Sequence, residues 1–181
     1  MTTVLGVTLA AQLVLFVFTG ISFLAPERRI WPPPSRHGWQ FYATWFLSWV
    51  TLSGAFLLAV FDENSLGLPF WSRLAAGLPL LGLGASLVAW GFRELSIQTT
   101  LGLQGNLIRS GPYRWSRNPQ YLGVCLYLVS LVFLSGSLLT AIGCLAVALW
   151  FVVTPLVEEP WLAERFGAEY QAYCRAVPRF F

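Results

Sequence analysis

Long apolar segments alternate with short polar ones along this chain. Five of the apolar segments are long enough, or nearly long enough, to cross a bilayer core of about 30 Å as a helix. They cover residues 4–24, 39–61, 74–92, 119–134 and 138–157, and the fourth is the shortest. This pattern predicts an all-α, polytopic membrane protein with about five transmembrane helices.

The link between the fourth and fifth segments is only Ser135-Gly136-Ser137. So short a link leaves little room for a loop, and we predict that the last two spans form a tight helical hairpin. Inside the third span, Gly82-Leu83-Gly84 matches part of a dinucleotide-binding fingerprint, but no strand precedes it. We interpret it instead as small residues that let two helices pack closely.

The basic residues give the predicted spans a direction. All eleven are Arg, and ten of them fall in the connections 25–38 and 93–118 and in the C-terminal segment 158–181. The second connection holds only Arg73, near Asp62 and Glu63. Because basic connections remain on the cytoplasmic side, this bias places the N-terminus outside and the C-terminus in the cytoplasm.

Composition agrees with the bilayer interpretation and narrows the partners. The chain has 181 residues, of which 56% are hydrophobic and 10% charged, whereas soluble domains carry about 25% charged residues. A net charge of +3 without a basic run indicates no nucleic-acid partner. The three cysteines show no metal-ligand spacing, so we expect no metal site.

The first connection contains a proline-rich stretch, Trp31-Pro32-Pro33-Pro34. Such a sequence favours a stiff polyproline conformation, which we expect to lie along the membrane interface. His37, the single histidine, follows it, and a surface contact is favoured over a catalytic role.

A polar, Arg-rich segment precedes the fourth span. Asn118-Pro119 has the form of a helix N-cap followed by proline at the first helical position. A helix N-terminus can hold an anionic group, and Arg114 and Arg117 strengthen its positive field. The alternative is that Asn118 only caps the helix and the arginines only meet lipid phosphates; both interpretations remain open here.

A second polar segment follows the fifth span. Pro155 is expected to kink or end that helix, and Pro160 to begin the next one. Between them stand Glu158 and Glu159. Two adjacent carboxylates beside apolar residues are costly unless they pair with cations or ligand donors, and for Glu158 we favour a ligand role.

Aromatic residues then recur at helical spacing. Phe166, Tyr170, Tyr173 and Val177 are three or four positions apart. This spacing predicts an amphipathic helix that packs back on the protein or on the membrane interface.

Together the two polar segments resemble a known motif pair, Gly-x-Tyr-x-x-x-Arg-His-Pro-x-Tyr-x-Gly followed by Glu-Glu-x-x-Leu-x-x-x-Phe-Gly-x-x-Tyr-x-x-Tyr. It is the pattern of isoprenylcysteine carboxyl methyltransferases and related membrane phospholipid methyltransferases. The resemblance covers roughly residues 98–178. The residues that carry it here are Gly111, Tyr113, Arg117, Asn118, Pro119, Tyr121, Gly123, Glu158, Glu159, Leu162, Phe166, Gly167, Tyr170 and Tyr173.

The resemblance implies an integral membrane methyltransferase that uses S-adenosylmethionine without a Rossmann domain. It implies one domain, residues 1–181, with a three-span scaffold (1–92) and a cofactor-binding core (93–181). A lipophilic or lipid substrate would enter sideways between helices, and no catalytic acid or base is assigned, because such a displacement depends on alignment and water exclusion. The implied cofactor contacts on the cytoplasmic side are Gln98, Asn106, Leu107, Ile108, Tyr113, Asn118, Pro119, Gln120, Tyr121 and Glu158.

Two positions depart from the family pattern. Asn118 replaces the usual His, and Thr154 replaces an Arg that carboxyl methyltransferases place four residues before the first motif Glu. The second change weakens the case for a prenylcysteine carboxylate; Thr154 and Arg117 are the candidate substrate contacts. The alternatives are an NADPH-dependent reductase of the sterol-reductase type and a non-catalytic protein that binds lipid headgroups or a partner. A prokaryotic inner membrane is the expected location.

Overall fold

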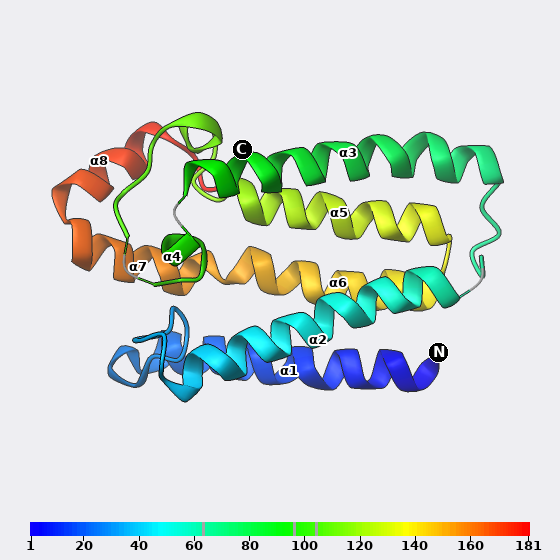
Figure 1. The fold of residues 1–181 in the computed structure, drawn as a ribbon, viewed down its shortest axis with the longest axis horizontal. Coiled ribbons are helices and arrows are strands. Elements are labelled where there is room, and N and C mark those ends of the chain that lie inside the picture. Colours follow the sequence, from blue (N-terminus) through cyan, green and yellow to red (C-terminus); the bar gives the residue numbers. More distant parts are fainter. Residues whose placement is uncertain (63, 96, 104) are drawn as a thin grey trace.

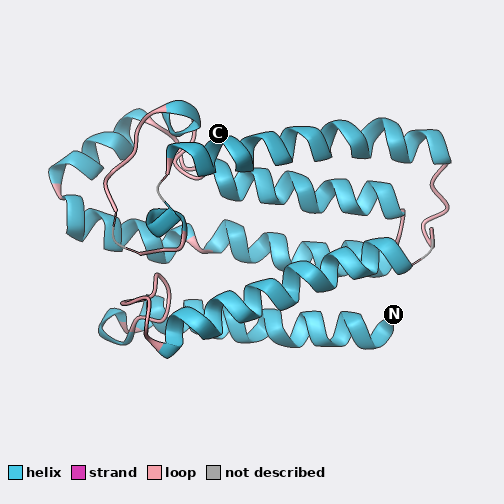
Figure 2. Ribbon diagram, in the orientation of Figure 1, coloured by secondary structure: helices cyan, strands magenta, loops and turns pink. Residues whose placement is uncertain are grey.

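The computed structural model describes residues 1–62, 64–95, 97–103 and 105–181. Every regular element in these ranges is a helix, so the all-α prediction is confirmed (Figure 2). The five long helices are α1 (Thr2–Leu24), α2 (Trp39–Phe61), α3 (Phe70–Glu94), α5 (Pro119–Ser135) and α6 (Leu138–Val153). The shorter ones are η1 (Pro26–Arg28), α4 (Ile97–Thr100), η2 (Gly111–Arg114), α7 (Pro155–Phe166) and α8 (Ala168–Ala176).

The long helices lie side by side in one bundle (Figure 1). Among the described residues, α1, α2, α3 and the pair α6–α7 are long and apolar enough to cross a membrane. Helix α5, the fourth predicted span, has 17 residues, which is about 26 Å, and α6 by itself has 16. The connections that carry ten of the eleven arginines lie at one end, opposite the N-terminus (Figure 1). The inside–outside orientation stays a prediction.

Helices α3 and α5 pack closely because glycines face the contact. Gly77, Gly84 and Gly91, spaced seven residues apart, are the buried residues of α3. A Cβ atom on Gly84 would lie 2.7 Å from the carbonyl oxygen of Gly123 on α5, and a Cβ on Gly123 would lie 2.8 Å from that of Gly84. The predicted close packing is therefore confirmed at Gly84, while Gly82 faces open space.

The predicted hairpin joins α5 to α6. Gly136 ends α5 with a φ of 63°, a left-handed conformation that suits glycine, and its N–H donates to the carbonyl of Val132 at 2.9 Å. Ser137 then caps α6, because its hydroxyl accepts from the Thr140 N–H at 3.0 Å.

The two prolines near the C-terminus behave differently. Pro155 separates α6 from α7, as predicted. Pro160 lies inside α7 and is exposed, so the prediction that it begins a helix is wrong. Pro155 already occupies the first turn of α7, so the helix begins before Pro160 and continues past it. The helix ends at Gly167, whose φ is 53°. The aromatic face of α8 packs back on the protein as predicted, with Tyr170 and Tyr173 buried.

The first connection folds inward. Trp31 is only 6% exposed and its ring lies 6.3 Å from those of Trp45 on α2 and Trp150 on α6, so the predicted position along the membrane interface is wrong. The Ser22 hydroxyl accepts from the backbone N–H groups of Ile30 and Trp31 at 2.9 and 3.0 Å, which turns the chain back into the bundle. Trp31 thereby reaches the region that the two polar segments form.

Candidate functional site

A cavity lies at the arginine-rich end of the bundle, between the start of α5, helices α7 and α8, and the first and third connections. With its open mouth included, the empty space of this cavity is about 930 Å³. Most of the residues predicted from the sequence line it: Asn106, Leu107, Ile108, Tyr113, Arg117, Asn118, Gln120, Tyr121 and Glu158.

Three predicted site residues do not line this cavity. Gln98 is exposed on α4, where its carbonyl accepts from the Leu103 N–H at 2.9 Å. Pro119 is buried in the first turn of α5. Thr154 is fully buried between α6 and α7, and its hydroxyl donates to the Trp150 carbonyl at 2.7 Å.

Glu158 is held in the cavity wall by two neutral donors. The Trp31 indole N–H donates to Oε1 of Glu158 at 2.6 Å, and the Tyr121 hydroxyl donates to the same oxygen. No cation pairs with Glu158 among the described residues. The carboxylate is therefore oriented by the first connection and by α5, and its second oxygen is left for a ligand donor.

Several polar atoms in the same wall are buried and have no hydrogen-bond partner among the described residues. They are Nε2 of Gln120, Oγ1 of Thr100 and Nε of Arg117, and all three residues line the cavity. A buried donor without a partner costs about 1–3 kcal/mol. Such unpaired polar atoms around one cavity are expected where a polar ligand binds.

An aromatic wall faces these polar groups. The Tyr173 hydroxyl donates to the Tyr113 carbonyl at 2.7 Å, which joins α8 to η2. Burial raises the pKa of Tyr113 and Tyr170 far above the usual range and raises the pKa of Tyr173 to about 12. These phenols stay neutral at physiological pH, so they can pack against rings or a cation but cannot serve as bases.

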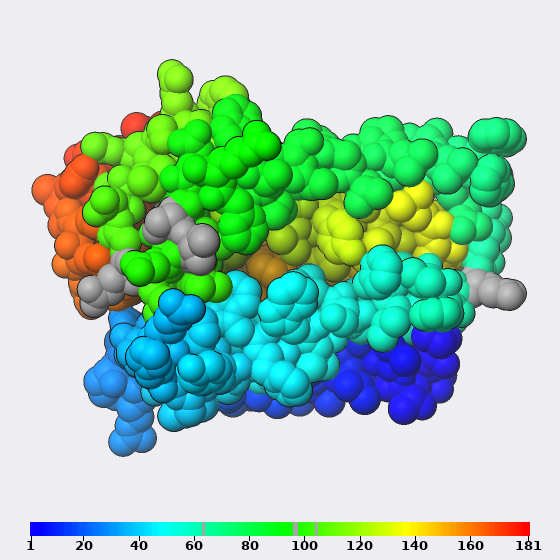
Figure 3. Space-filling view, in the orientation of Figure 1, coloured from blue at the N-terminus to red at the C-terminus, as the bar shows by residue number. Residues whose placement is uncertain are grey.

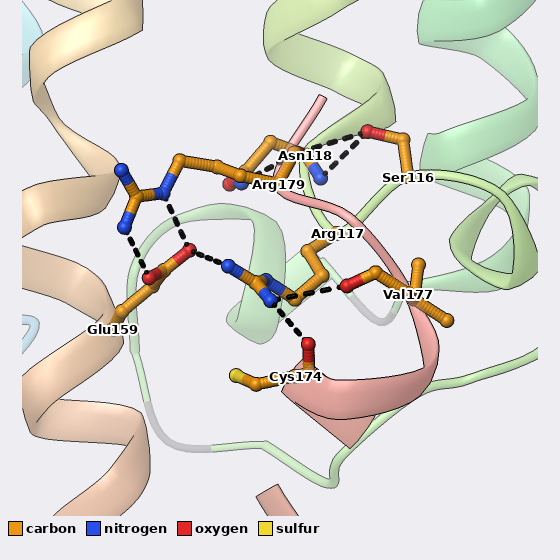
Figure 4. Close-up of polar contacts among 7 residues, drawn as sticks. All are labelled: Ser116, Arg117, Asn118, Glu159, Cys174, Val177 and Arg179. Atoms are coloured by element: carbon orange, nitrogen blue, oxygen red, sulfur yellow. Dashed lines mark hydrogen bonds and ion pairs between the residues drawn. The ribbon is translucent and has the colours of Figure 1, made fainter. Parts of the chain in front are cut away.

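Glu159, the neighbour of Glu158, belongs to a separate ion cluster, shown in Figure 4. Its carboxylate accepts from Arg117 at 2.8 Å and from Nε and NH2 of Arg179 at 2.9 and 2.7 Å. Arg117 also donates to the carbonyls of Cys174 and Val177, both at 3.0 Å. We call Arg117, Glu159 and Arg179 the C-terminal ion cluster, because it fixes the chain after α8 against the start of α5.

Asn118 occupies the N-cap position of α5, as predicted, but its side chain does not cap the helix. Its amide nitrogen instead donates to the Arg179 carbonyl at 3.1 Å (Figure 4). The first turn of α5 is therefore free of a side-chain cap where Gln120 and Tyr121 line the cavity, and its N–H groups add a positive field there.

The cavity also uses residues that sequence reasoning missed, chiefly Trp31, Thr100, Trp161 and Arg165. Trp31 is 127 positions from its partner Glu158, and its proline-rich surroundings look the same for an interfacial and for a buried tryptophan. The closest local signal was Gly102, whose φ of 76° and missing Cβ make room for the Trp31 ring, 2.9 Å from where a Cβ would stand.

An apolar groove runs along the face between α2 and α3, which Figure 3 shows as a hollow. Helix α5 forms its floor through Val124 and Tyr127. The empty space of the groove is about 1290 Å³ with its open side included. Tyr127 lies six positions along α5 from Tyr121, about 9 Å along the helix axis. The groove thus presents an apolar surface to the membrane close to the cavity.

A comparison with family models gives one match, described as phospholipid methyltransferase, over residues 72–169. No curated protein and no solved structure matches the chain. The matched range contains the first polar motif segment and the second as far as Glu169, without Tyr170 and Tyr173, and runs from α3 to the start of α8; it leaves out α1, α2 and the connection that carries Trp31. The family resemblance inferred from the motifs is therefore confirmed.

Proposed function

This chain belongs to the phospholipid methyltransferase family, and we propose that it transfers a methyl group from S-adenosylmethionine to a lipophilic acceptor at the cytoplasmic face of a membrane. The family and the apolar helices make it an integral membrane methyltransferase that acts on lipid-related substrates. The identity of the methyl donor and the place of each residue in the site belong to the proposal.

The observation that carries the proposal is the surroundings of Glu158. A carboxylate without a cationic partner, held by Trp31 and Tyr121, faces a cavity whose wall holds unpaired donors on Gln120 and Thr100. A ribose with two hydroxyl donors and a purine with ring acceptors satisfy both kinds of group. The residues present thus fit a nucleoside-containing cofactor.

S-adenosylmethionine bound there supplies a methyl carbon on a cationic sulfur; the acceptor's lone pair bonds to that carbon as the carbon–sulfur bond breaks and the sulfur keeps the electron pair. The protein contributes by positioning the methyl donor and the acceptor. Glu158 and the start of α5 orient the nucleoside, and the neutral rings of Tyr113 and Tyr170 exclude water and can stabilise a cation.

We retain as proposed cofactor contacts the predicted residues that line the cavity. These are Asn106, Leu107, Ile108, Tyr113, Asn118, Gln120, Tyr121 and Glu158. Contacts of Gln98 and Pro119 with the cofactor stay predictions, because neither residue lines the cavity. For the acceptor, the geometry favours Arg117, which lines the cavity, over Thr154, which is fully buried.

The groove between α2 and α3 supports a lipid acceptor. Its lining is mainly apolar, it faces the membrane, and its floor leads along α5 toward Tyr121. We propose that an acyl or other hydrocarbon chain lies in this groove while the polar end of the acceptor reaches the cavity. The arginine bias supports placing the cavity in the cytoplasm, and we propose a prokaryotic inner membrane as its location.

The direct test is methyl transfer in a bilayer. The protein is reconstituted into phospholipid vesicles with methyl-labelled S-adenosylmethionine, and the lipid extract is separated and counted. We expect label in a lipid fraction for the wild type and far less for Glu158→Gln at the same subsaturating concentration of S-adenosylmethionine. Protein that stays folded but never labels lipid across zwitterionic and anionic vesicles would contradict the proposed reaction, and stabilisation by NADPH in place of S-adenosylhomocysteine would favour a reductase.

A further inference from the structure

Two arginines pack against one tryptophan that lines the cavity. The guanidinium carbon of Arg29 lies 5.2 Å from the centroid of the Trp161 ring, and that of Arg165 lies 5.7 Å from it. Arg165 also lies 5.1 Å from the ring of Phe166. Trp161 and Arg165 line the cavity, and Arg165 is exposed, whereas Arg29 is not part of the lining but packs on the Trp161 ring.

These two cations lack the partners that other arginines have. Arg109, Arg117 and Arg179 each pair with a carboxylate, whereas neither Arg29 nor Arg165 forms an ion pair within the described ranges. Only one hydrogen bond joins them to the described chain, from Nε of Arg29 to the Pro32 carbonyl at 2.8 Å. Burial lowers the pKa of Arg29, partly offset by Glu164, as expected for a cation that is short of compensating charge.

Aromatic contacts hold these side chains without using their N–H groups. A guanidinium that packs on an indole keeps its edge donors free, and their planar fork matches a carboxylate or a phosphate. In the cavity wall, Glu158 has no cationic partner among the described residues. The lining thus holds a carboxylate at Glu158 and a guanidinium at Arg165 without ion-pair partners in the described part of the chain, with Arg29 packed beside Arg165 on the Trp161 ring.

We propose that Arg29 and Arg165 together bind an anionic oxygen group, a carboxylate or a phosphate, of a molecule that occupies the cavity. The inference rests on the proposed function, which offers two sources of this group: the amino-acid carboxylate of the cofactor and the phosphate of a lipid acceptor. Arg29 lies outside the range that the family model matches, so this contact is supplied by the chain's own first connection.

The test compares charged probes with uncharged counterparts. Thermal unfolding of the detergent-solubilised protein is titrated with S-adenosylhomocysteine and with methylthioadenosine, which keeps the nucleoside and thioether but lacks the carboxylate. A parallel titration uses dihexanoyl phosphatidylglycerol and dihexanoylglycerol, which lacks the phosphate. The variants are Arg29→Gln, Arg165→Gln and their double mutant, and Arg28→Gln, an exposed neighbour without a Trp161 ring contact in the described part of the chain, is the matched control.

We expect each single variant to weaken one anionic probe at least about tenfold and to leave its uncharged counterpart unchanged. The double mutant should lose less than the product of the two single effects, because both arginines hold the same group. If the variants lose affinity for S-adenosylhomocysteine alone, the bound group is the cofactor's carboxylate. If they lose affinity for phosphatidylglycerol alone, it is the lipid phosphate.

Wild-type affinity for both anionic probes in Arg29→Gln and Arg165→Gln would overturn the inference. So would equal losses for the charged and uncharged probes, or an equal loss in Arg28→Gln. A wild-type protein that binds neither nucleoside would contradict the proposed function instead, and the phosphatidylglycerol titration would still decide whether the two arginines bind an anion.

Discussion

Glu158 and Glu159 are neighbours on α7 with opposite surroundings. Glu158 accepts hydrogen bonds from two neutral groups, of Trp31 and Tyr121, in the wall of the cavity. Glu159 is paired with two cations, Arg117 and Arg179, in the C-terminal ion cluster. The difference teaches that one carboxylate is paired with cations while the next has only neutral partners and faces the cavity.

The largest expected effect comes from breaking the C-terminal ion cluster. Glu159→Gln leaves Arg117, whose side chain is only 11% exposed, without its counter-charge, so we expect a loss of about 3 kcal/mol in the free energy of unfolding. Denaturant unfolding in detergent measures it, with the exposed Glu164→Gln as the control. Unchanged stability in Glu159→Gln would mean that the cluster does not hold the C-terminus.

The second effect concerns binding rather than stability. Glu158→Gln keeps an oxygen that can accept from Trp31 and Tyr121 but removes the negative charge. We expect S-adenosylmethionine affinity to fall about tenfold to a hundredfold, as for the loss of a charged hydrogen-bond partner, with the unfolding free energy changed by less than about 1 kcal/mol. Equilibrium dialysis with labelled cofactor gives the affinity, and a value equal to that of the wild type would count against the assignment.

A smaller effect is expected from the residue that orients Glu158. Trp31→Phe keeps an aromatic ring against Trp45 and Trp150 but removes the indole N–H. We expect about 1 kcal/mol of the loss of this bond to the carboxylate to appear in cofactor binding, which weakens it about fivefold. Dialysis as above checks it, with Trp45→Phe as the control, because the Trp45 indole N–H donates to the Leu101 carbonyl at 3.4 Å and not to Glu158; equal losses in the two variants would show that the bond to Glu158 has no particular role.

The smallest effect is expected from an exposed ion pair, which contrasts with the less exposed C-terminal ion cluster. Arg109 and Glu169 form an ion pair at 2.8 Å, but their side chains are 50% and 53% exposed. Solvent screens such a pair, so we expect Arg109→Gln to change the unfolding free energy by no more than about 0.5 kcal/mol. A loss as large as that of Glu159→Gln would show that exposure does not separate the two pairs.

The helices were largely predictable from the sequence because burial in a bilayer demands uninterrupted apolar runs. The second span was predicted at 39–61 and is Trp39–Phe61 in the structure, since Gly38 and Asp62 end the apolar run on both sides. The third span is longer than predicted, Phe70–Glu94, because aromatic residues at its start and Arg93 and Glu94 at its end are tolerated at helix ends.

The division of labour in the site was only partly predictable. The sequence favoured Glu158 as a ligand contact but assigned no role to Glu159, and only tertiary contacts place Glu159 in an ion cluster. The partner of Glu158, Trp31, belongs to another connection, and the second cation on Glu159, Arg179, lies beyond the motifs. Local patterns placed most cavity residues near one another, but the pairing of particular side chains depends on how α7 is rotated against the first connection.

The most direct measurement is stabilisation by S-adenosylhomocysteine in two matched variants. A ligand at 100 times its dissociation constant adds about 2.7 kcal/mol of stability to a protein that binds it. We predict that Glu159→Gln starts from a lower melting temperature and keeps the ligand-induced shift, whereas Glu158→Gln starts near the wild-type temperature and loses most of the shift at the same concentration. A full shift in Glu158→Gln, or its loss in Glu159→Gln alone, would contradict the assignment of the two carboxylates.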